Sequence, residues 1–175
     1  ALSQDEVVLA VRTQDSEVPE VITGAIHAFT QPVTVIDQVW KIYQKNGAEI
    51  REDFALLTQG RKSAAIQDSF TRIYNPDQVF LEQGVQINAA LLNAENGPSY
   101  LGKNSVVHEG ALIRGPFALC EDSHVNMGAK VRGDTTVGPH SKIGGEVSNS
   151  VVFGYSNKSH DGFLGNSVIG EWCNI

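Results

Sequence analysis

An aliphatic residue recurs at every sixth position through the second half of the chain. The series is Leu101, Val107, Ile113, Leu119, Val125, Val131, Val137 and Ile143. If aliphatic residues filled roughly a quarter of all positions, such a run in one phase would arise by chance about once in 10⁵ trials. We therefore interpret the pattern as a structural repeat.

A six-residue period fits neither an amphipathic helix, with apolar steps of three and four, nor a lone half-buried strand, which alternates strictly. It fits one short strand and one turn per unit, stacked into a parallel β-helix with a shared interior. Two positions before each aliphatic residue stands a mostly small residue, with Phe117 as the bulky exception. These positions are Ser105, Ala111, Phe117, Ser123, Ala129, Thr135 and Ser141. Leu81 and Ile87 are also one repeat apart, so we expect the β-helix to begin near Val79, with an insertion over residues 93–98.

The first hundred residues do not repeat. Residues 6–12 (EVVLAVR) are apolar enough for a strand, and residues 18–29 form a mixed segment. A helix is expected from Pro32 to a stop at Asn46-Gly47, and a second helix over residues 48–58. The expected domains are residues 1–30, residues 31–72 as a small helical linker region, and residues 73–175 as the β-helix.

Composition and charge exclude several classes of protein. The chain has 175 residues, 41% of them hydrophobic, and a formal net charge of −7. Clustered Lys and Arg, which non-specific nucleic-acid binding requires, are missing. Two cysteines in no metal-ligand spacing indicate reduced thiols, and neither a leader nor an apolar run of about 18 residues is found. We therefore expect a cytoplasmic protein with no nucleic-acid or membrane partner.

The repeat loses its regularity after Ile143. It continues imperfectly through Val147 and Phe153 and then places Ser159 at an aliphatic position, beside His160 and Asp161. Repeats often depart from their pattern where function requires it. A polar loop extruded between coils is the other interpretation.

The sequence of this irregular region resembles a known family. Residues 156–175 (SNKSHDGFLGNSVIGEWCNI) are similar to the acetyltransferase segment of the GlmU family, which carries Gly-His-Leu-Thr-Tyr-Leu-Gly-Asp, a short spacer and Ile-Gly-Asp-Asn-Val-Asn-Ile-Gly. GlmU-type enzymes acetylate glucosamine 1-phosphate and then uridylylate it. The runs RGPFALCE, GGEVSNSVVFGYSNKSHDGFLG and GEWCN more closely resemble GlmU-like sugar nucleotidyltransferases common in Bacteroidetes. The resemblance covers residues 30–175.

The resemblance implies a left-handed parallel β-helix, a homotrimer, and acyl-CoA sites between neighbouring β-helices. It also implies that residues 1–30 are a remnant of, or adjoin, a nucleotidyltransferase-like domain, and that His160 is a general base acting on a sugar amine. Asn174 matches a family Asn that orients the sugar or the base. The implied small molecules are a sugar phosphate and acetyl-CoA as co-substrate, with Mg²⁺ needed only by the nucleotidyltransferase domain.

Some family residues are replaced in this chain. Ser159 stands for the family Gly, Phe163 for its Tyr and Asn166 for its Asp. A family Lys aligns near Ser148, so a phosphate would need other cations, for which Lys130, Arg132 and Lys158 are the nearest candidates.

Family sequences that complete both activities are missing. The Gly-rich loop that holds a nucleoside triphosphate does not occur, and the chain begins without Met and stops on the first residue of a new repeat. We therefore expect a fragment that is inactive by itself.

Two alternatives to an acyltransferase remain. The first is a non-catalytic β-helix that trimerises and positions the attached domain. The second is a zinc enzyme, which would need three convergent imidazoles. His108, His124 and His140 do not show the required pair spacing, so we expect no metal site.

Overall fold

The computed structural model describes residues 1–4, 7–11 and 24–175. They form two compact units, Ala1–Val35 and Ile36–Ile175. In the first unit, β1 (Leu2–Gln4) pairs antiparallel with β2 (Val7–Ala10) and parallel with β3 (His27–Ala28). β2 lies within the strand predicted over residues 6–12. Residues 6 and 12, and much of the mixed segment 18–29, lie outside the described residues.

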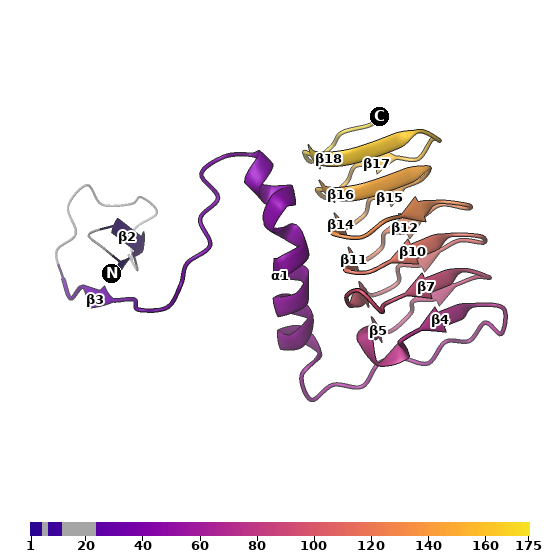
Figure 1. Cartoon of the computed structure of the whole chain (residues 1–175), viewed down its shortest axis with the longest axis horizontal. Helices are drawn as coiled ribbons and strands as arrows, with labels where there is room; N and C mark the ends of the chain where they lie inside the picture. The colour runs from indigo at the N-terminus through magenta and orange to yellow at the C-terminus, as the bar shows by residue number, and fades with distance from the viewer. Residues whose placement is uncertain (5–6, 12–23) are drawn as a thin grey trace. The chain divides into compact units, whose positions relative to one another are not determined.

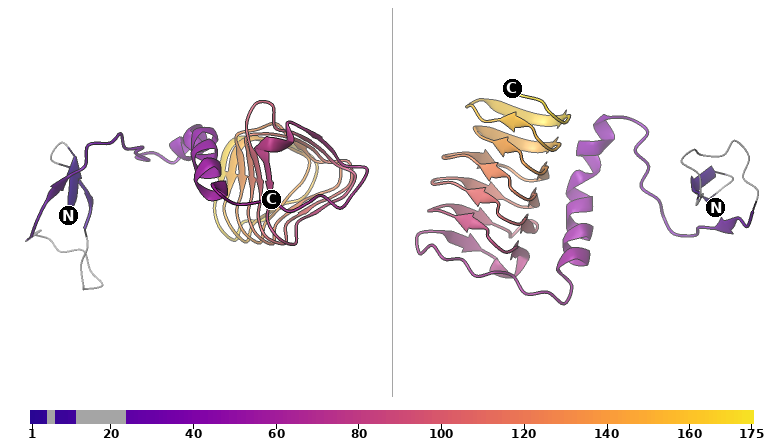
Figure 2. Two further views of the ribbon diagram at one scale, coloured as in Figure 1. Left: turned by 90° about the horizontal axis from the view of Figure 1, so that it is seen from below. Right: turned by 180° about the vertical axis from the view of Figure 1, so that it is seen from behind.

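The second unit is a solenoid of parallel strands with three faces, accompanied by one long helix, α1 (Trp40–Thr58). Its coils stack from β4 at one end to β18 at the other (Figure 1). Viewed along the stack, the coils superpose, and α1 lies outside one side (Figure 2). Strands in register on successive coils pair in parallel throughout, so the predicted parallel β-helix is confirmed. The left-handed sense implied by the resemblance stays a prediction.

Each coil contributes one strand segment to each face, except the last, which has no strand on the third face. The first face consists of β4 (Arg72–Tyr74), β7 (Leu91–Asn93), β10 (Leu112–Arg114), β13 (Lys130–Val131) and the first parts of β16 (Glu146–Val152) and β18 (Phe163–Ile169). The second consists of β5 (Val79–Leu81), β8 (Ser99–Leu101), β11 (Phe117–Leu119), β14 (Thr135–Val137) and the remainder of β16 and β18. The third consists of β6 (Gln86–Ile87), β9 (Val106–Val107), β12 (His124–Val125), β15 (Lys142–Ile143) and β17 (Asn157–Lys158). A 3-10 turn, η1 (Pro76–Gln78), joins β4 to β5.

The predicted aliphatic positions form the interior of the solenoid. All eight repeat residues from Leu101 to Ile143 are at most 2% exposed, and the small positions that precede them are fully buried. Burial of a Val, Leu or Ile side chain contributes about 1.5–3 kcal/mol each, so these columns are the main source of stability. β4 pairs with β7, so the solenoid begins at Arg72, one strand before the predicted start near Val79.

The predicted register is confirmed at Val147 and is wrong beyond it. Val152 and Lys158, rather than Phe153 and Ser159, continue the interior columns, because Val137 pairs with Val152 and Ile143 pairs with Lys158. The coil that contains Ile143 is shorter than the coils before it, mainly because of a tight corner at Gly144-Gly145. These two glycines lie against the backbone of the next coil. A Cβ on Gly145 would lie 2.7 Å from the carbonyl oxygen of Gly162, so the corner requires glycine.

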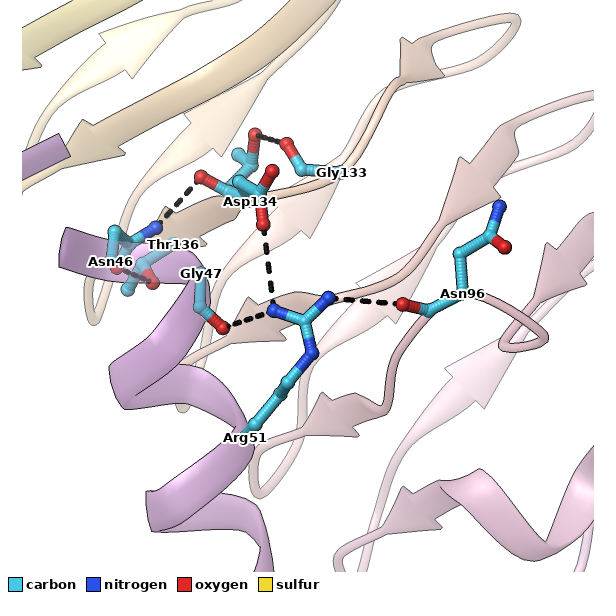
Figure 3. Close-up of polar contacts among 8 residues, drawn as sticks. Asn46, Gly47, Arg51, Asn96, Gly133, Asp134 and Thr136 are labelled. Atoms are coloured by element: carbon cyan, nitrogen blue, oxygen red, sulfur yellow. Dashed lines mark hydrogen bonds and ion pairs between the residues drawn. The ribbon is translucent and has the colours of Figure 1, made fainter. Parts of the chain in front are cut away.

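The helical region also differs from the prediction. A single helix begins at Trp40 rather than Pro32 and continues through Asn46 and Gly47 to Thr58. Asn46 and Gly47 face the solenoid across the polar contacts drawn in Figure 3. Asn46 Nδ2 donates to the carbonyl of Asp134 at 2.8 Å, and Thr136 Oγ1 donates to Asn46 Oδ1 at 2.7 Å. These tertiary contacts outweigh the local tendency of Asn-Gly to end a helix.

α1 runs along the second face of the solenoid, from the level of β18 to the level of β5 (Figure 1). Ile50 is its buried apolar residue. Arg51 donates to the carbonyl of Asn96 at 3.0 Å, which ties the middle of the helix to a second coil. No helix in the part of the chain that the structure describes is long and apolar enough to cross a membrane.

Candidate active site

His160 lies on the exposed corner between β17 and β18, where the chain passes from the third face to the first. Ser159 Oγ donates to Asn157 Oδ1, and Asn157 Nδ2 donates to Asn174 Oδ1 at 2.7 Å. Asn174 is thus connected through Asn157 to the residue that precedes His160. The structure places these two predicted site residues on neighbouring coils.

Lys130 and Arg132 line a shallow groove on the first face, with a volume of about 580 Å³. Arg114, Leu112 and Glu146 are also in its lining. Arg132 Nη1 forms an ion pair with Glu146 Oε1 at 2.9 Å, with 65% of the Arg132 side chain exposed. The groove therefore combines three cationic side chains with one carboxylate on an accessible surface.

One outward column of the first face links the groove to the strand that follows the His160 corner. Lys130 pairs with Glu146, and Glu146 pairs with Phe163, three residues after His160. The backbone N–H of Arg132 donates to the carbonyl of Val147, so Arg132 lies one coil from the position of Ser148. The two predicted surface cations are therefore close to the place where the family Lys aligns.

Lys158 does not share this surface. It is 7% exposed and lies in the interior column of the third face, next to Ile143. Its Nζ donates to the carbonyl oxygen of His160 at 2.5 Å. Of the three predicted cations, the structure brings only Lys130 and Arg132 together.

Arg114 is the groove residue that sequence reasoning missed. Ile113 pairs with Val131, which places Arg114 beside Arg132 on successive coils. Their separation of 18 positions is one complete coil, and this spacing was the signal in the sequence. A guanidinium with five donors binds phosphate oxygens bidentately, so two arginines beside a lysine suit a phosphate monoester.

A histidine pair on the third face was also missed. His108 Nε2 and His124 Nδ1 are 3.3 Å apart, with the rings stacked at 5.6 Å. Burial, and then the nearby Lys142 ammonium, lower the pKa of His124. No group of three or more His, Cys, Asp or Glu able to hold a metal occurs among residues 1–4, 7–11 and 24–175.

An exposed imidazole beside a cationic groove is suited to acid–base chemistry on a phosphorylated substrate. Imidazole exchanges protons near neutral pH, and the cations can bind the phosphate without taking part in the proton transfer. The side chain of His160 makes no hydrogen bond with the described residues, so both ring nitrogens are available.

Comparisons with known proteins match both parts of the chain. A family model described as sugar nucleotidyl transferase matches residues 1–62. The bifunctional protein GlmU of Rippkaea orientalis is 23% identical over 192 residues, which cover 96% of this chain and 42% of that protein. GlmU of Trichodesmium erythraeum is 33% identical over 79 residues, which cover 44% of this chain and 16% of that protein. The chain thus spans about two-fifths of the length of the first relative.

One solved structure similar to this chain is a mutant GDP-perosamine N-acetyl transferase from Caulobacter crescentus, in complex with CoA and GDP-perosamine. It matches with a TM-score of 0.40 and 13% sequence identity, over 74% of this chain and 60% of that one.

Proposed function

We propose that the solenoid carries the acyl-transfer site of a GlmU-type sugar-phosphate transferase, and that the first residues of the chain belong to its nucleotidyltransferase-like domain. The observation that carries this proposal is the exposed His160 corner beside the groove of Lys130, Arg132 and Arg114. The similarity to GlmU over most of the chain, and of residues 1–62 to the sugar nucleotidyl transferase family, supports it.

The reaction is transfer of an acetyl group from CoA to the amine of an amino sugar phosphate. His160 accepts a proton from the amine as its nitrogen attacks the thioester carbonyl carbon. The C–N bond forms and the C–S bond breaks, so the CoA thiolate leaves and takes up a proton. Without this proton transfer the attacking nitrogen would keep a positive charge in the tetrahedral intermediate and be expelled in preference to the thiolate, which is why the reaction needs a base.

The groove binds the phosphate of the sugar in this proposal. Lys130 and Arg132 supply the charge that the family Lys supplies at Ser148, and Arg114 adds a second guanidinium. Phe163 has no hydroxyl to donate to the substrate, so these cations carry a larger share of phosphate binding. Asn174 orients the sugar or the base from the next coil.

We further propose that the protein works as a homotrimer, with acyl-CoA bound between neighbouring solenoids. The residues of this chain alone then hold the sugar phosphate and the base, and form only one wall of the acyl-CoA site. A longer GlmU-type protein is needed for turnover, and this chain alone is expected to bind the sugar phosphate without acetylating it.

Calorimetric titration of glucosamine 1-phosphate into this chain tests the groove. Lys130→Gln and Arg132→Gln should each weaken binding about tenfold, the effect of losing one charge-assisted hydrogen bond. Lys103→Gln removes an exposed lysine away from the groove and should leave binding unchanged. Equal affinity for glucosamine and glucosamine 1-phosphate would contradict a phosphate site in this groove.

A further inference from the structure

The interior column of the third face contains one charged residue among aliphatic ones. It runs through Ile87, Val107, Val125 and Ile143, and then reaches Lys158. Lys158 is 7% exposed and is the only charged side chain in the buried set of the residues that the structure describes. Each coil below it fills the same position with an aliphatic side chain.

A lysine in this position is costly for the fold. Moving an ammonium group from water into a protein interior costs several kcal/mol unless a carboxylate or several hydrogen bonds compensate. Within the described ranges, no carboxylate lies within 4.0 Å of Lys158 Nζ. Its one hydrogen bond is to the carbonyl oxygen of His160. An apolar residue at this position is expected to leave the solenoid at least as stable, so stability does not explain the lysine.

The hydrogen bond of Lys158 reaches the middle of an otherwise weakly held corner. The backbone ladder ends on one side where Gly144 N–H donates to the Lys158 carbonyl at 2.7 Å, and resumes where Glu146 N–H donates to the Gly162 carbonyl at 3.0 Å. Between them, Asn126 Nδ2 donates to the Ser159 carbonyl at 3.3 Å, a long bond. The ammonium of Lys158 holds the next carbonyl, that of His160 itself.

We propose that Lys158 is the positioning residue for His160, holding the backbone of the corner from inside the solenoid so that the imidazole faces the substrate. The catalytic meaning of this inference rests on the proposed acyl transfer. A general base must lie within hydrogen-bond reach of its proton, and a misplacement of about 1 Å can cost about 100-fold in rate. Because the ammonium is buried and directed at a backbone carbonyl, Lys158 contributes to the reaction through His160 and not by binding phosphate.

Lys158→Met is the variant that separates positioning from stability. Methionine keeps an unbranched stem in the aliphatic column and removes the ammonium, so the melting temperature should stay the same or rise. The matched control is Ile143→Met, one coil below in the same column, which removes no hydrogen-bond donor.

Amide hydrogen exchange on this chain tests whether Lys158 holds the backbone of the His160 corner. In Lys158→Met, the Glu146 amide, which is bonded to the corner, should exchange about tenfold faster or more. The Lys130 amide lies one coil below and donates to the Gly145 carbonyl, and its exchange rate should stay that of wild type. Unchanged exchange at Glu146 would overturn the proposal.

Steady-state kinetics of a longer protein that contains this chain test whether Lys158 contributes to the proposed acyl transfer. Lys158→Met should lower kcat about 10- to 100-fold with KM for both substrates unchanged, and Ile143→Met should leave kcat unchanged. An unchanged kcat, or a loss that matches a loss of folded protein, would overturn the proposal. If the wild-type protein transfers no acyl group, the proposed function fails, and the exchange result alone decides whether Lys158 holds the corner.

Discussion

Gly47 of α1 lies directly against the side chain of Asp134, so close that a Cβ on residue 47 would overlap the carboxylate. The approach is stabilised on both sides. Asn46 donates to the Asp134 carbonyl, and Arg51 lies 3.8 Å from the Asp134 carboxylate (Figure 3). Glycine in a helix normally costs about 1 kcal/mol relative to alanine, and here it permits the helix to dock.

We therefore expect Gly47→Ala to destabilise the protein by about 1–2 kcal/mol, although alanine is the better helix former. Asp134 has a φ of 47°, so Asp134→Gly suits its backbone and removes the clashing side chain. In that background, Gly47→Ala should become stabilising by up to about 1 kcal/mol. Urea denaturation, followed by circular dichroism at the helix band, gives the free energy of unfolding of wild type, of each single variant and of the double variant. Equal effects of Gly47→Ala in both backgrounds would show that Asp134 is not the cause.

The helix illustrates what the sequence could not predict. The apolar positions Ile50, Phe54 and Leu57 correctly indicated a helix over residues 48–58. Asn46-Gly47 is a common helix end, and the local sequence therefore predicts that the first helix stops there. The groups that stabilise the helix here, the backbone carbonyl of Asp134 and the hydroxyl of Thr136, lie 88 and 90 residues further along the chain than Asn46. Only the folded solenoid brings them to the helix.

Two serines in one interior column provide a matched test of buried hydrogen bonds. Ser141 Oγ donates to the carbonyl of Phe153 at 3.0 Å and accepts from the backbone N–H of Ser156 at 3.0 Å. The hydroxyl of Ser105, two coils away, is buried with no partner among the described residues. Ser141→Ala should cost about 1–3 kcal/mol because it leaves buried groups unpaired, and Ser105→Ala should be neutral or stabilising. Thermal denaturation compares the two variants, and a similar loss in both would contradict these assignments.

Glu82 makes the stability of the solenoid depend on pH. Tyr100 OH donates to Glu82 Oε1 at 2.7 Å, and Arg61 Nη2 lies 2.7 Å from Oε2. Burial acts to raise the pKa of Glu82, but the hydrogen bonds from Tyr100 and Arg61 outweigh it and lower the pKa from its usual 4.5. The folded state therefore favours the ionised carboxylate. This stabilisation is present above pH 4.5 and is lost as pH falls through the lower pKa of the folded state.

Glu82→Gln should accordingly lower the melting temperature at pH 7, and its difference from wild type should shrink as pH falls below 4.5. Melting curves between pH 7 and pH 3 measure this difference. Glu109→Gln is the control, because Glu109 is exposed and has no ion pair within the described ranges. A difference between wild type and Glu82→Gln that is constant over this range would contradict the assignment.

The candidate site could be predicted from sequence only where the repeat or the family motif extends to it. The motif identified His160, and the six-residue period identified the faces that carry Lys130 and Arg132. The sequence pattern places Lys158 on the surface because the six-residue step is applied unchanged after Val147, which predicts Phe153 and Ser159 as interior residues. In the structure Val152 follows Val147 after five residues, and this shift of one residue moves Lys158 into the interior. No local hydrophobic pattern encodes the shorter step.

The most direct test of the proposed function is acetyl transfer to glucosamine 1-phosphate by a longer protein that contains this chain, with His160→Ala beside His27→Ala as the control from the first unit. Loss of a general base should lower kcat by about 10²- to 10⁴-fold, while the melting temperature and the oligomeric state stay those of wild type. His27→Ala should retain full activity. Undiminished acetyl transfer by His160→Ala would contradict the proposal and favour a solenoid that serves only as a scaffold.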